Sequence, residues 1–299
     1  MPVRPFLLEG DPVKLSLLIP TLNRIGVVYN VLRHLEHQTR KPDEIVIVDQ
    51  TDRRDPLLEE YAAAHPEVNY IRIKRKGLPN ARNVAIRNAT GDILLFVDDD
   101  IVPDDDLVRI HFENYADPSV AGVGGLVRGG YDRPDPRAPV GTFVPSSGMV
   151  VRNFGVGERR DVDHLPGGHM SFRREVFEKV GDFDPTYGGA SIGEETDFCL
   201  RAVHAGFRLV YDSRAALDHL RLPMGGCRAP TFEEWLFWHA HNGILFVLRH
   251  AWKKALPGFV LRRVARFTLF AFEKGSLALP GIGLIGLLRG VSTHLSTRG

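Results

Sequence analysis

The chain has 299 residues, of which 43% are hydrophobic and 25% charged, proportions typical of a globular protein that buries a sizeable core. The two cysteines, Cys199 and Cys227, exclude a disulfide framework and favour a reducing compartment. Residues 1–11 do not resemble a signal peptide, and no apolar run reaches the roughly 17–25 residues that cross a bilayer, so we expect a cytoplasmic protein.

The net charge of +1 conceals an asymmetry along the chain. Residues 1–227 carry 28 Lys and Arg against 34 Asp and Glu, whereas residues 228–299 carry 10 against 3. A basic segment behind an acidic one predicts an anionic partner, either lipid headgroups or nucleic acid. We favour an anionic membrane surface and no nucleic acid, because the acidic part would repel a phosphate backbone and no nucleic-acid-binding motif is present.

Strand-like and helix-like patterns alternate over the first hundred residues. Short apolar runs predict strands, and apolar residues at helical spacing predict helices. The predicted strands lie at 15–20, 44–49, 69–73 and 92–97, and the predicted helices at 27–38, 56–64 and 80–89. This alternation predicts an α/β fold with a Rossmann-like, mostly parallel sheet flanked by helices. Ligands of such sheets bind at the carboxyl ends of the strands, where polar clusters follow three of these runs.

The rest of the chain changes character at about residue 227. Before that point, glycine- and proline-rich loops connect predicted strands at 120–127, 148–154 and 207–211 and predicted helices at 172–180 and 194–205. From residue 231, aromatic and basic residues are interleaved, which predicts helices in a membrane interface, with an ordinary helical lid as the alternative. The uncharged run at 275–288 is short and contains Pro280, so we expect it to dip into a bilayer at most.

Three adjacent carboxylates, Asp98, Asp99 and Asp100, follow the fourth predicted strand. Like charges this close repel one another, so we expect a cation or a set of positive partners to hold them. A divalent ion bound by one or two carboxylates and substrate phosphates is the usual solution, and a solvated acidic turn is the alternative.

Three further positions each have a functional and a structural interpretation. Glu194 and Glu195 open a predicted helix, where a carboxylate either suits the helix dipole or acts as a general base on an acceptor hydroxyl. His219 is either structural or an additional ligand of a carboxylate-held metal. Arg82 is either a surface residue or a ligand of a pyrophosphate.

Five segments, in this order and at this spacing, are specific to one family. They read LSLLIPTLNR at 15–24, EIVIVDQTD at 44–52, GLPNARNVAIRNATGDILLFVDDDIVP at 77–103, GGHMSFRREVFEKVGDFDP at 167–185 and GEETDFCLRAVHAGFRLVYDSRAALDHL at 193–220. Over residues 14–222 the chain resembles the family 2 glycosyltransferases, which have the GT-A fold, and especially their bacterial rhamnosyltransferase-like members.

The resemblance implies a role for each candidate residue. For the donor, it implies a nucleoside-binding loop at Pro20, Thr21 and Leu22, base recognition by Asp49 and Gln50, and nucleotide or ribose contacts by Arg82, Asp98 and Asp99. For the rest of the site, it implies Mg²⁺ or Mn²⁺ at Asp98, Asp100 and His219, an acceptor side at Gly167, Gly168 and His169, and a catalytic base at Glu195, with Glu194 as the second candidate.

The chain departs from the family pattern at three positions. Gln50 stands where the family often has Asp, and because an amide both donates and accepts hydrogen bonds we do not assume UDP as the nucleotide. Glu195 replaces the usual Asp and is one methylene longer, which leaves the choice between Glu194 and Glu195 open. His169 replaces the usual Asn, and we connect this difference with the acceptor.

We therefore expect a GT-A catalytic domain at 1–227, with a nucleotide-sugar half at 14–115 and an acceptor half at 116–227. A helical membrane-interface segment is expected at 228–299. The expected activity is metal-dependent, inverting sugar transfer from a UDP-, dTDP- or GDP-sugar to a glycan or lipid-linked acceptor at the inner face of the cell membrane.

Two alternatives to this activity remain. One is a catalytically degenerate GT-A module that binds a nucleotide-sugar or a protein partner. The other is a nucleotidyltransferase, although the loop at 20–26 lacks the glycine-rich phosphate cradle of that class.

Overall fold

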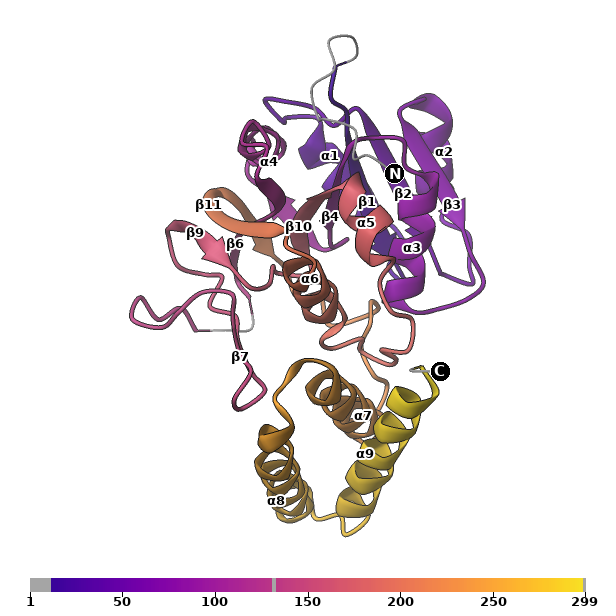
Figure 1. The fold of residues 1–299 in the computed structure, drawn as a ribbon. Helices are drawn as coiled ribbons and strands as arrows, with labels where there is room; N and C mark the ends of the chain where they lie inside the picture. Colours follow the sequence, from indigo (N-terminus) through magenta and orange to yellow (C-terminus); the bar gives the residue numbers. More distant parts are fainter. Residues whose placement is uncertain (1–11, 131–132, 298–299) are drawn as a thin grey trace.

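A mixed sheet of nine strands forms the centre of the protein in the computed structural model, which describes residues 12–130 and 133–297 (Figure 1). In sheet order the strands are β3 (Val68–Arg72), β2 (Glu44–Asp49), β1 (Leu15–Thr21), β4 (Ile93–Val97), β10 (His169–Arg173), β6 (Val120–Arg128), β11 (Arg208–His219) and β5 (Ile101–Pro103), and β9 (Arg159–Val162) pairs with β11. The amino-terminal segment, in which no signal peptide is expected, lies outside the described residues.

The first four strands along the chain form the parallel unit that the sequence predicts. β1 pairs in parallel with β2 and β4, and β2 pairs in parallel with β3. The connections are the helices α1 (Val27–Leu35), α2 (Pro56–Ala64) and α3 (Leu78–Asn88). The carboxyl ends of β1, β2 and β4 therefore meet at one edge of the sheet, which is where such sheets bind ligands.

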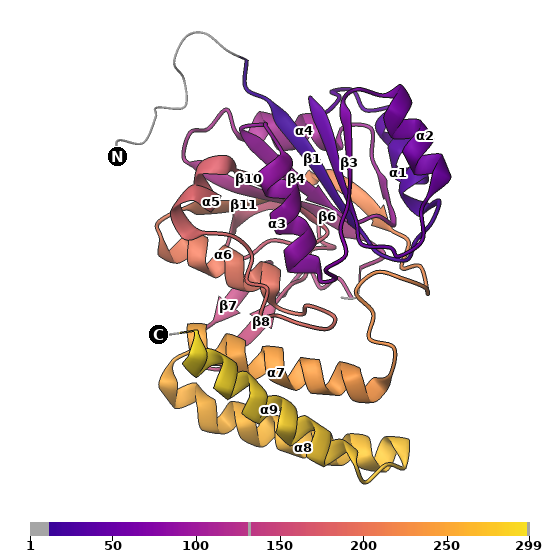
Figure 2. The ribbon, with the colours of Figure 1, turned by 90° about the vertical axis from the view of Figure 1, so that its right-hand side faces the viewer.

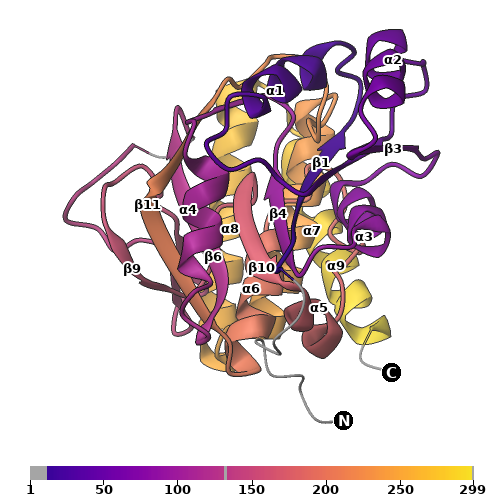
Figure 3. The same ribbon diagram turned by 90° about the horizontal axis from the view of Figure 1, so that it is seen from above.

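The side chains of β1 and β4 alternate between two hydrophobic cores. Leu18, Leu94 and Phe96 lie in the core beneath α3, α5 (Arg174–Val180) and α6 (Glu194–His204). Leu17 and Leu95 lie in the core beneath α1 and α4 (Leu107–Asn114). Seen from above in Figure 3, α1 and α4 lie on one side of the sheet and α3, α5 and α6 on the other. Because both faces are covered, β4 is buried along its whole length and holds the acidic turn that follows it in a rigid frame.

The centre of the sheet differs from the sequence-based expectation. The helix expected at 172–180 begins only at Arg174, because residues 169–173 form β10. This strand is inserted antiparallel between β4 and β6. Its sequence, HMSFR, alternates polar and apolar residues as a half-exposed strand does, yet all five residues are buried in the centre of the sheet.

Two other strands also differ from their predicted bounds. The strand expected at 207–211 continues to His219 as β11, with a shift of register between Asp212 and Ala216. His219 is thus the last residue of a strand that pairs with β5. The strand expected at 148–154 is limited to β8 (Met149–Val151), which pairs with β7 (Thr142–Val144) in a separate two-stranded sheet.

Three long helices form a layer below the sheet in Figures 1 and 2. They are α7 (Phe232–His250), α8 (Leu256–Lys274), which follows a 3₁₀ turn at Lys253–Ala255, and α9 (Leu279–Ser296). α9 packs closely on α7, because a Cβ atom at Gly286 or Gly290 would lie 2.5 Å from a carbonyl oxygen of α7. The segment expected to be helical is therefore helical, and among the described residues no helix combines the length and apolarity that crossing a membrane requires.

The helical layer is joined to the sheet through a third hydrophobic core. Leu236, Ala240 and Ile244 of α7 pack there with Leu200 of α6 and Tyr187 from the loop before it. The uncharged run at 275–288 contains the α8–α9 turn and the first half of α9, whose inner side belongs to this core. The division into domains at residue 227 stays a prediction.

Candidate functional site

A cavity of about 930 Å³ opens at the carboxyl edge of the sheet and extends to α7. At one end it is lined by Pro20, Thr21, Leu22 and Gln50 and by the acidic turn Asp98–Asp100. At the other end it is lined by Phe232, Trp235 and His239 of α7. Gly167, Gly168, Glu194 and Glu195 lie along its walls, so most of the residues selected from the sequence share one space.

The acidic turn after β4 is held by partners from β1 and β11. Asp99 is 4% exposed and accepts a hydrogen bond of 2.6 Å from the Thr21 hydroxyl. Burial raises the pKa of Asp99 to about 6, although the neighbouring guanidinium of Arg24 opposes the rise. His219 places its Nε2 atom 3.5 Å from carboxylate oxygens of both Asp98 and Asp100, and the hydrogen bond to Asp98 raises the pKa of the His219 imidazole.

The residues Asp98, Asp100 and His219 fit a divalent cation. One potential ligand atom from each lies within 4.8 Å of the others. Two carboxylates and an imidazole form a donor set that suits Mn²⁺ or Mg²⁺, with open positions for phosphate oxygens. The predicted metal ligands are therefore brought together, although Asp98 and Asp100 come from one turn and His219 from the end of a distant strand.

Arg24 is the main residue of the site that the sequence analysis missed. Its guanidinium Nη1 atom forms an ion pair with Asp99 and lies 2.9 Å from Oδ1 of Asp100. Its Nε atom donates to the carbonyl oxygen of Met224 over 2.9 Å. A signal was available, because Arg24 is the basic residue of the loop that follows β1, and three adjacent carboxylates require a positive partner.

Two glycines allow the backbone to approach the acidic turn. A Cβ atom at Gly168 would overlap the carboxylate of Asp98, and the Gly168 carbonyl accepts a bond of 3.3 Å from the Asp98 amide. A Cβ atom at Gly167 would lie 3.1 Å from Cγ of Glu195. A side chain at either position would therefore push apart the acidic turn and the glutamates, which explains the Gly-Gly pair in physical terms.

Arg82 is buried and forms an ion pair with Glu194. It is 2% exposed, and its Nη2 atom donates to the Gly167 carbonyl over 2.7 Å. Burial raises the pKa of Glu194 to about 8, although the Arg82 guanidinium opposes the rise. A carboxylate that is 1% exposed and already paired is badly placed to accept a proton from a substrate.

Glu195 is the better candidate for a base. Its side chain is partly exposed and lines the cavity beside Gly167. It lies in the first turn of α6, whose N-cap residue is Gly193, and an acidic side chain at this end of a helix interacts favourably with the helix dipole.

Asp49 and Gln50 face different surroundings. Gln50 lines the cavity, and its side-chain oxygen accepts a bond of 2.7 Å from the Gly77 amide. Asp49 is buried and accepts bonds of 2.7 Å from the Tyr70 hydroxyl and the Thr51 amide. Gln50 thus faces the cavity, whereas Asp49 braces the end of β2.

His169 lies inside the protein, away from the cavity lining. It is the first residue of β10, pairs with Val97 in the sheet and is 0% exposed. Burial lowers the pKa of its imidazole to about 3. Gly125 makes room for the ring, since a Cβ atom there would overlap it. The expectation that His169 contacts the acceptor stays a prediction, and the structure offers it no direct path to the cavity.

The end of the cavity at α7 is aromatic. Trp235 stacks on His239 at 4.7 Å between ring centroids and on Phe232 at 5.3 Å, and Phe270 of α8 meets Trp235 edge-on. None of these residues was assigned to the site from the sequence. The interleaved aromatic and basic residues of this segment predict a membrane interface, and only the tertiary structure turns part of α7 toward the cavity.

Residues 16–181, more than half of the chain, match the profile of the family described as Glycosyl transferase family 2. The chain belongs to this family. The parallel unit, the acidic turn and the Gly-Gly pair all lie within the matched residues.

Two curated relatives agree with this membership. The glucosyl-dolichyl phosphate glucuronosyltransferase of Haloferax volcanii is 27% identical over 61% of this chain and 60% of its own length. The O-antigen chain rhamnosyltransferase RfbN of Salmonella typhimurium is 25% identical over 69% of this chain and 66% of its own length. This family 2 chain thus spans less than two thirds of either relative.

The fold is that of known glycosyltransferases. The mannosyltransferase PcManGT from Pyrobaculum calidifontis, solved with GDP-Man and Mn²⁺, aligns with a TM-score of 0.58 over 97% of this chain and 91% of its own. At 17% sequence identity this similarity concerns the fold alone. It confirms the expected GT-A fold.

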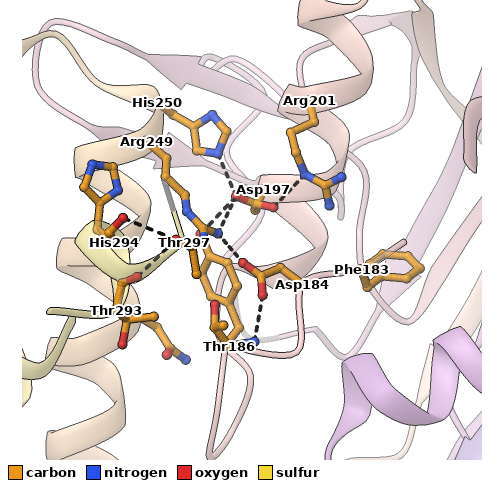
Figure 4. Close-up of polar contacts among 12 residues, drawn as sticks. Phe183, Asp184, Thr186, Asp197, Arg201, Arg249, His250, Thr293, His294 and Thr297 are labelled. Carbon is orange, nitrogen blue, oxygen red and sulfur yellow. Dashed lines mark hydrogen bonds and ion pairs between the residues drawn. The ribbon is translucent and has the colours of Figure 1, made fainter. Parts of the chain in front are cut away.

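The helix that carries the glutamates of this family 2 chain is tied to α7 through Asp197 (Figure 4). Asp197 is 1% exposed and accepts bonds of 2.9 Å from Arg201 of its own helix and from His250 of α7. Arg249 of α7 contacts it at 3.4 Å and pairs with Asp184 at 2.5 Å. Burial opposes ionisation, but the bond from His250 and the two arginines lower the pKa of Asp197 to about 2.

We expect the substitution Asp197→Asn to destabilise the protein by about 3 kcal/mol at pH 7, because it leaves buried cations without their partner. The folded pKa of about 2 lies below the reference value of 3.8, so the carboxylate stabilises fully above about pH 4 and loses its contribution as the pH falls through 2. The difference between variant and wild type in urea unfolding should therefore shrink as the pH falls from about 4 to about 2.

Asp182→Asn is the matched control, because Asp182 pairs with Arg87 on the surface. Exposed pairs contribute only about 0–1 kcal/mol, so this variant should unfold nearly as the wild type does. Equal unfolding curves for the Asp197 and Asp182 variants would contradict the role given to Asp197.

Proposed function

We propose that the chain is a metal-dependent, inverting glycosyltransferase that moves a sugar from a nucleoside-diphosphate sugar to an acceptor hydroxyl. The observation that carries the proposal is the shared cavity, in which the cluster Asp98, Asp100 and His219 and the carboxylate of Glu195 both take part. The names of the two curated relatives, a glucuronosyltransferase and a rhamnosyltransferase, support sugar transfer as the activity.

The proposed chemistry divides between the two ends of the site. A bound Mg²⁺ or Mn²⁺ would neutralise the charge of the leaving nucleoside diphosphate. Glu195 takes the proton from the acceptor hydroxyl as this oxygen attacks the anomeric carbon from the face opposite the leaving group. Arg82 binds the Gly167 carbonyl and pairs with Glu194, so its proposed role is to hold the wall of the cavity in place. A single displacement of this kind inverts the anomeric configuration.

The donor is proposed to lie along Pro20, Thr21, Leu22 and Gln50, with its phosphates toward the acidic turn. Calorimetric titration with UDP, GDP, CDP and dTDP, each with and without Mn²⁺, tests this. We expect Mn²⁺-dependent binding of one nucleotide, weakened about tenfold or more by Asp100→Ala, since this removes a metal ligand. If the wild type bound none of the four nucleotides with Mn²⁺, the proposed function would change from a transferase to a catalytically degenerate module that binds a partner.

The base assignment predicts a separation of binding from turnover. Glu195→Gln should retain Mn²⁺-dependent nucleotide binding but lose roughly 10²–10⁴-fold in transfer rate, because an amide cannot take the acceptor proton. Initial rates of sugar transfer at saturating donor measure this. Glu178→Gln, at an exposed position of α5, is the control and should keep the wild-type rate. A Glu195→Gln variant with undiminished transfer would exclude Glu195 as the base.

The aromatic end of the cavity supports a glycan or lipid-linked acceptor. Aromatic faces pack well on apolar faces of sugar rings and on hydrocarbon chains, and Phe232, Trp235 and His239 supply such faces. Comparing simple alkyl glycosides with isoprenoid-phosphate glycosides as acceptors tests this class. Turnover only with acceptors of another class would count against it.

The outer face of the helical layer supports peripheral binding to an anionic membrane. Leu261, Leu269 and Phe272 of α8 lie within one helical face and are 52–79% exposed, and Leu277 in the α8–α9 turn is 92% exposed. Two basic residues of α8, Arg262 and Arg266, border this face. Exposed apolar side chains beside basic ones are typical of helices that lie in the headgroup region.

We expect the wild type to sediment with vesicles that contain phosphatidylglycerol and to bind neutral phosphatidylcholine vesicles more weakly. The double substitution Phe272→Glu and Leu277→Glu should reduce binding to the anionic vesicles at least about tenfold, because it removes two apolar contacts and adds two like charges. Leu57→Glu, at an exposed position of α2, is the control. No binding by the wild type would remove the membrane from the proposal and leave the transferase intact.

A further inference from the structure

Arg24 occupies an unusual position for an arginine beside a candidate metal site. Its side chain is 8% exposed, and it reaches from the loop after β1 into the same corner as the acidic turn. There the Nη1 atom contacts Asp99 and Asp100 together. The guanidinium therefore supplies the positive charge that these buried carboxylates need in the unliganded chain.

The contact with Asp100 involves an oxygen atom that the metal site also needs. Oδ1 of Asp100 lies 2.9 Å from Nη1 of Arg24 and 3.5 Å from Nε2 of His219. The other oxygen, Oδ2, accepts a hydrogen bond of 3.0 Å from the Leu222 amide. Because Oδ2 is used by the backbone, a cation coordinated between Asp100 and His219 would compete with Arg24 for Oδ1.

The backbone around Arg24 keeps its guanidinium close to the cavity if the contact with Asp100 is lost. The Nε atom stays bound to the Met224 carbonyl, and the side chain packs on Gly225 and Gly226. These glycines have φ angles of +70° and +66°, and the Gly226 amide donates to the Leu22 carbonyl over 2.8 Å. A planar guanidinium at this rim is well suited to bind phosphate oxygens through two parallel hydrogen bonds.

We propose that Arg24 is an internal counter-cation that occupies Asp100 in the unliganded chain and passes to the diphosphate of the donor when a divalent cation binds. This inference rests on the proposed function, since it needs a cation and a phosphorylated donor in the same cavity. Under this proposal the divalent cation and the donor bind cooperatively. Each binds more strongly when the other is present, because the donor gives the displaced arginine a new anionic partner.

Titration with Mn²⁺ alone, followed by calorimetry and by the EPR signal of free Mn²⁺, tests the first half of the proposal. Arg24→Gln should bind Mn²⁺ about tenfold more tightly than the wild type in the absence of nucleotide, because the competing cation is gone. Arg24→Lys should lie between the two, since it keeps the charge without the fork of donors. Arg228→Gln removes one charge from an exposed position of the same cavity and should match the wild type.

Repeating the titrations with a saturating nucleoside diphosphate tests the second half. In the wild type the nucleotide should strengthen Mn²⁺ binding by a factor within the usual range for coupled sites, roughly 5–150-fold. In Arg24→Gln this factor should fall, leaving only the coupling that direct contacts between Mn²⁺ and the phosphates supply. Thermal melting shows whether each variant is folded, and if Arg24→Gln is not, the comparison between Arg24→Lys and Arg228→Gln decides.

Several results would overturn the inference. If Arg24→Gln bound Mn²⁺ no more tightly than the wild type, competition between Arg24 and Mn²⁺ for Asp100 would be excluded. If Arg228→Gln showed an equal gain in Mn²⁺ affinity, the effect would be one of net charge alone. An unchanged coupling factor would exclude transfer to the diphosphate. If the wild type bound no Mn²⁺ even with nucleotide, the metal-dependent function itself would fail, which is a different result from these three.

Discussion

The concentration of negative charge at the end of β4 is the constraint on which the rest of the site depends. Three consecutive carboxylates follow a fully buried strand, and Asp99 and Asp100 are themselves almost completely buried. Charges in such a position cost several kcal/mol each unless opposite charges and hydrogen bonds meet them. Here the partners are Thr21 at the end of β1, Arg24 in the loop after it and His219 at the end of β11, so distant segments converge on one corner.

The first turn of α6, on the other side of the cavity, also carries buried acidic residues that need positive partners. Glu194 is neutralised by Arg82 of α3, and Asp197, one turn later, is neutralised by Arg201 and by the end of α7. The first turn of α6 is therefore held between the sheet layer and the helical layer. In this way the carboxyl-terminal helices take part in the geometry of the site, in addition to the membrane contact proposed for their outer face.

The sequence patterns predicted the amino-terminal half well, because its strands and helices alternate and are each buried in a regular way. The failures concern segments whose burial comes from neighbours distant in the chain. Residues 172 and 173 are predicted as the start of a helix but belong to the central strand at 169–173, because β4 and β6 pair with this strand on both sides. Arg24 and Trp235 were not assigned to the site, because their roles depend on which other segments they meet.

By itself, the sequence determined the α/β class, the parallel unit, and the identity and order of the acidic, glycine and glutamate segments, since these follow from local periodicity and from motif spacing. The tertiary structure alone decided which partners those charges have and how deeply they are buried. Glu194 and Glu195 are neighbours of the same type and both line the cavity, yet Glu194 is buried and ion-paired with Arg82, whereas Glu195 is partly exposed. The reason is physical: burial and ion pairing depend on distances between segments, and local sequence does not contain those distances.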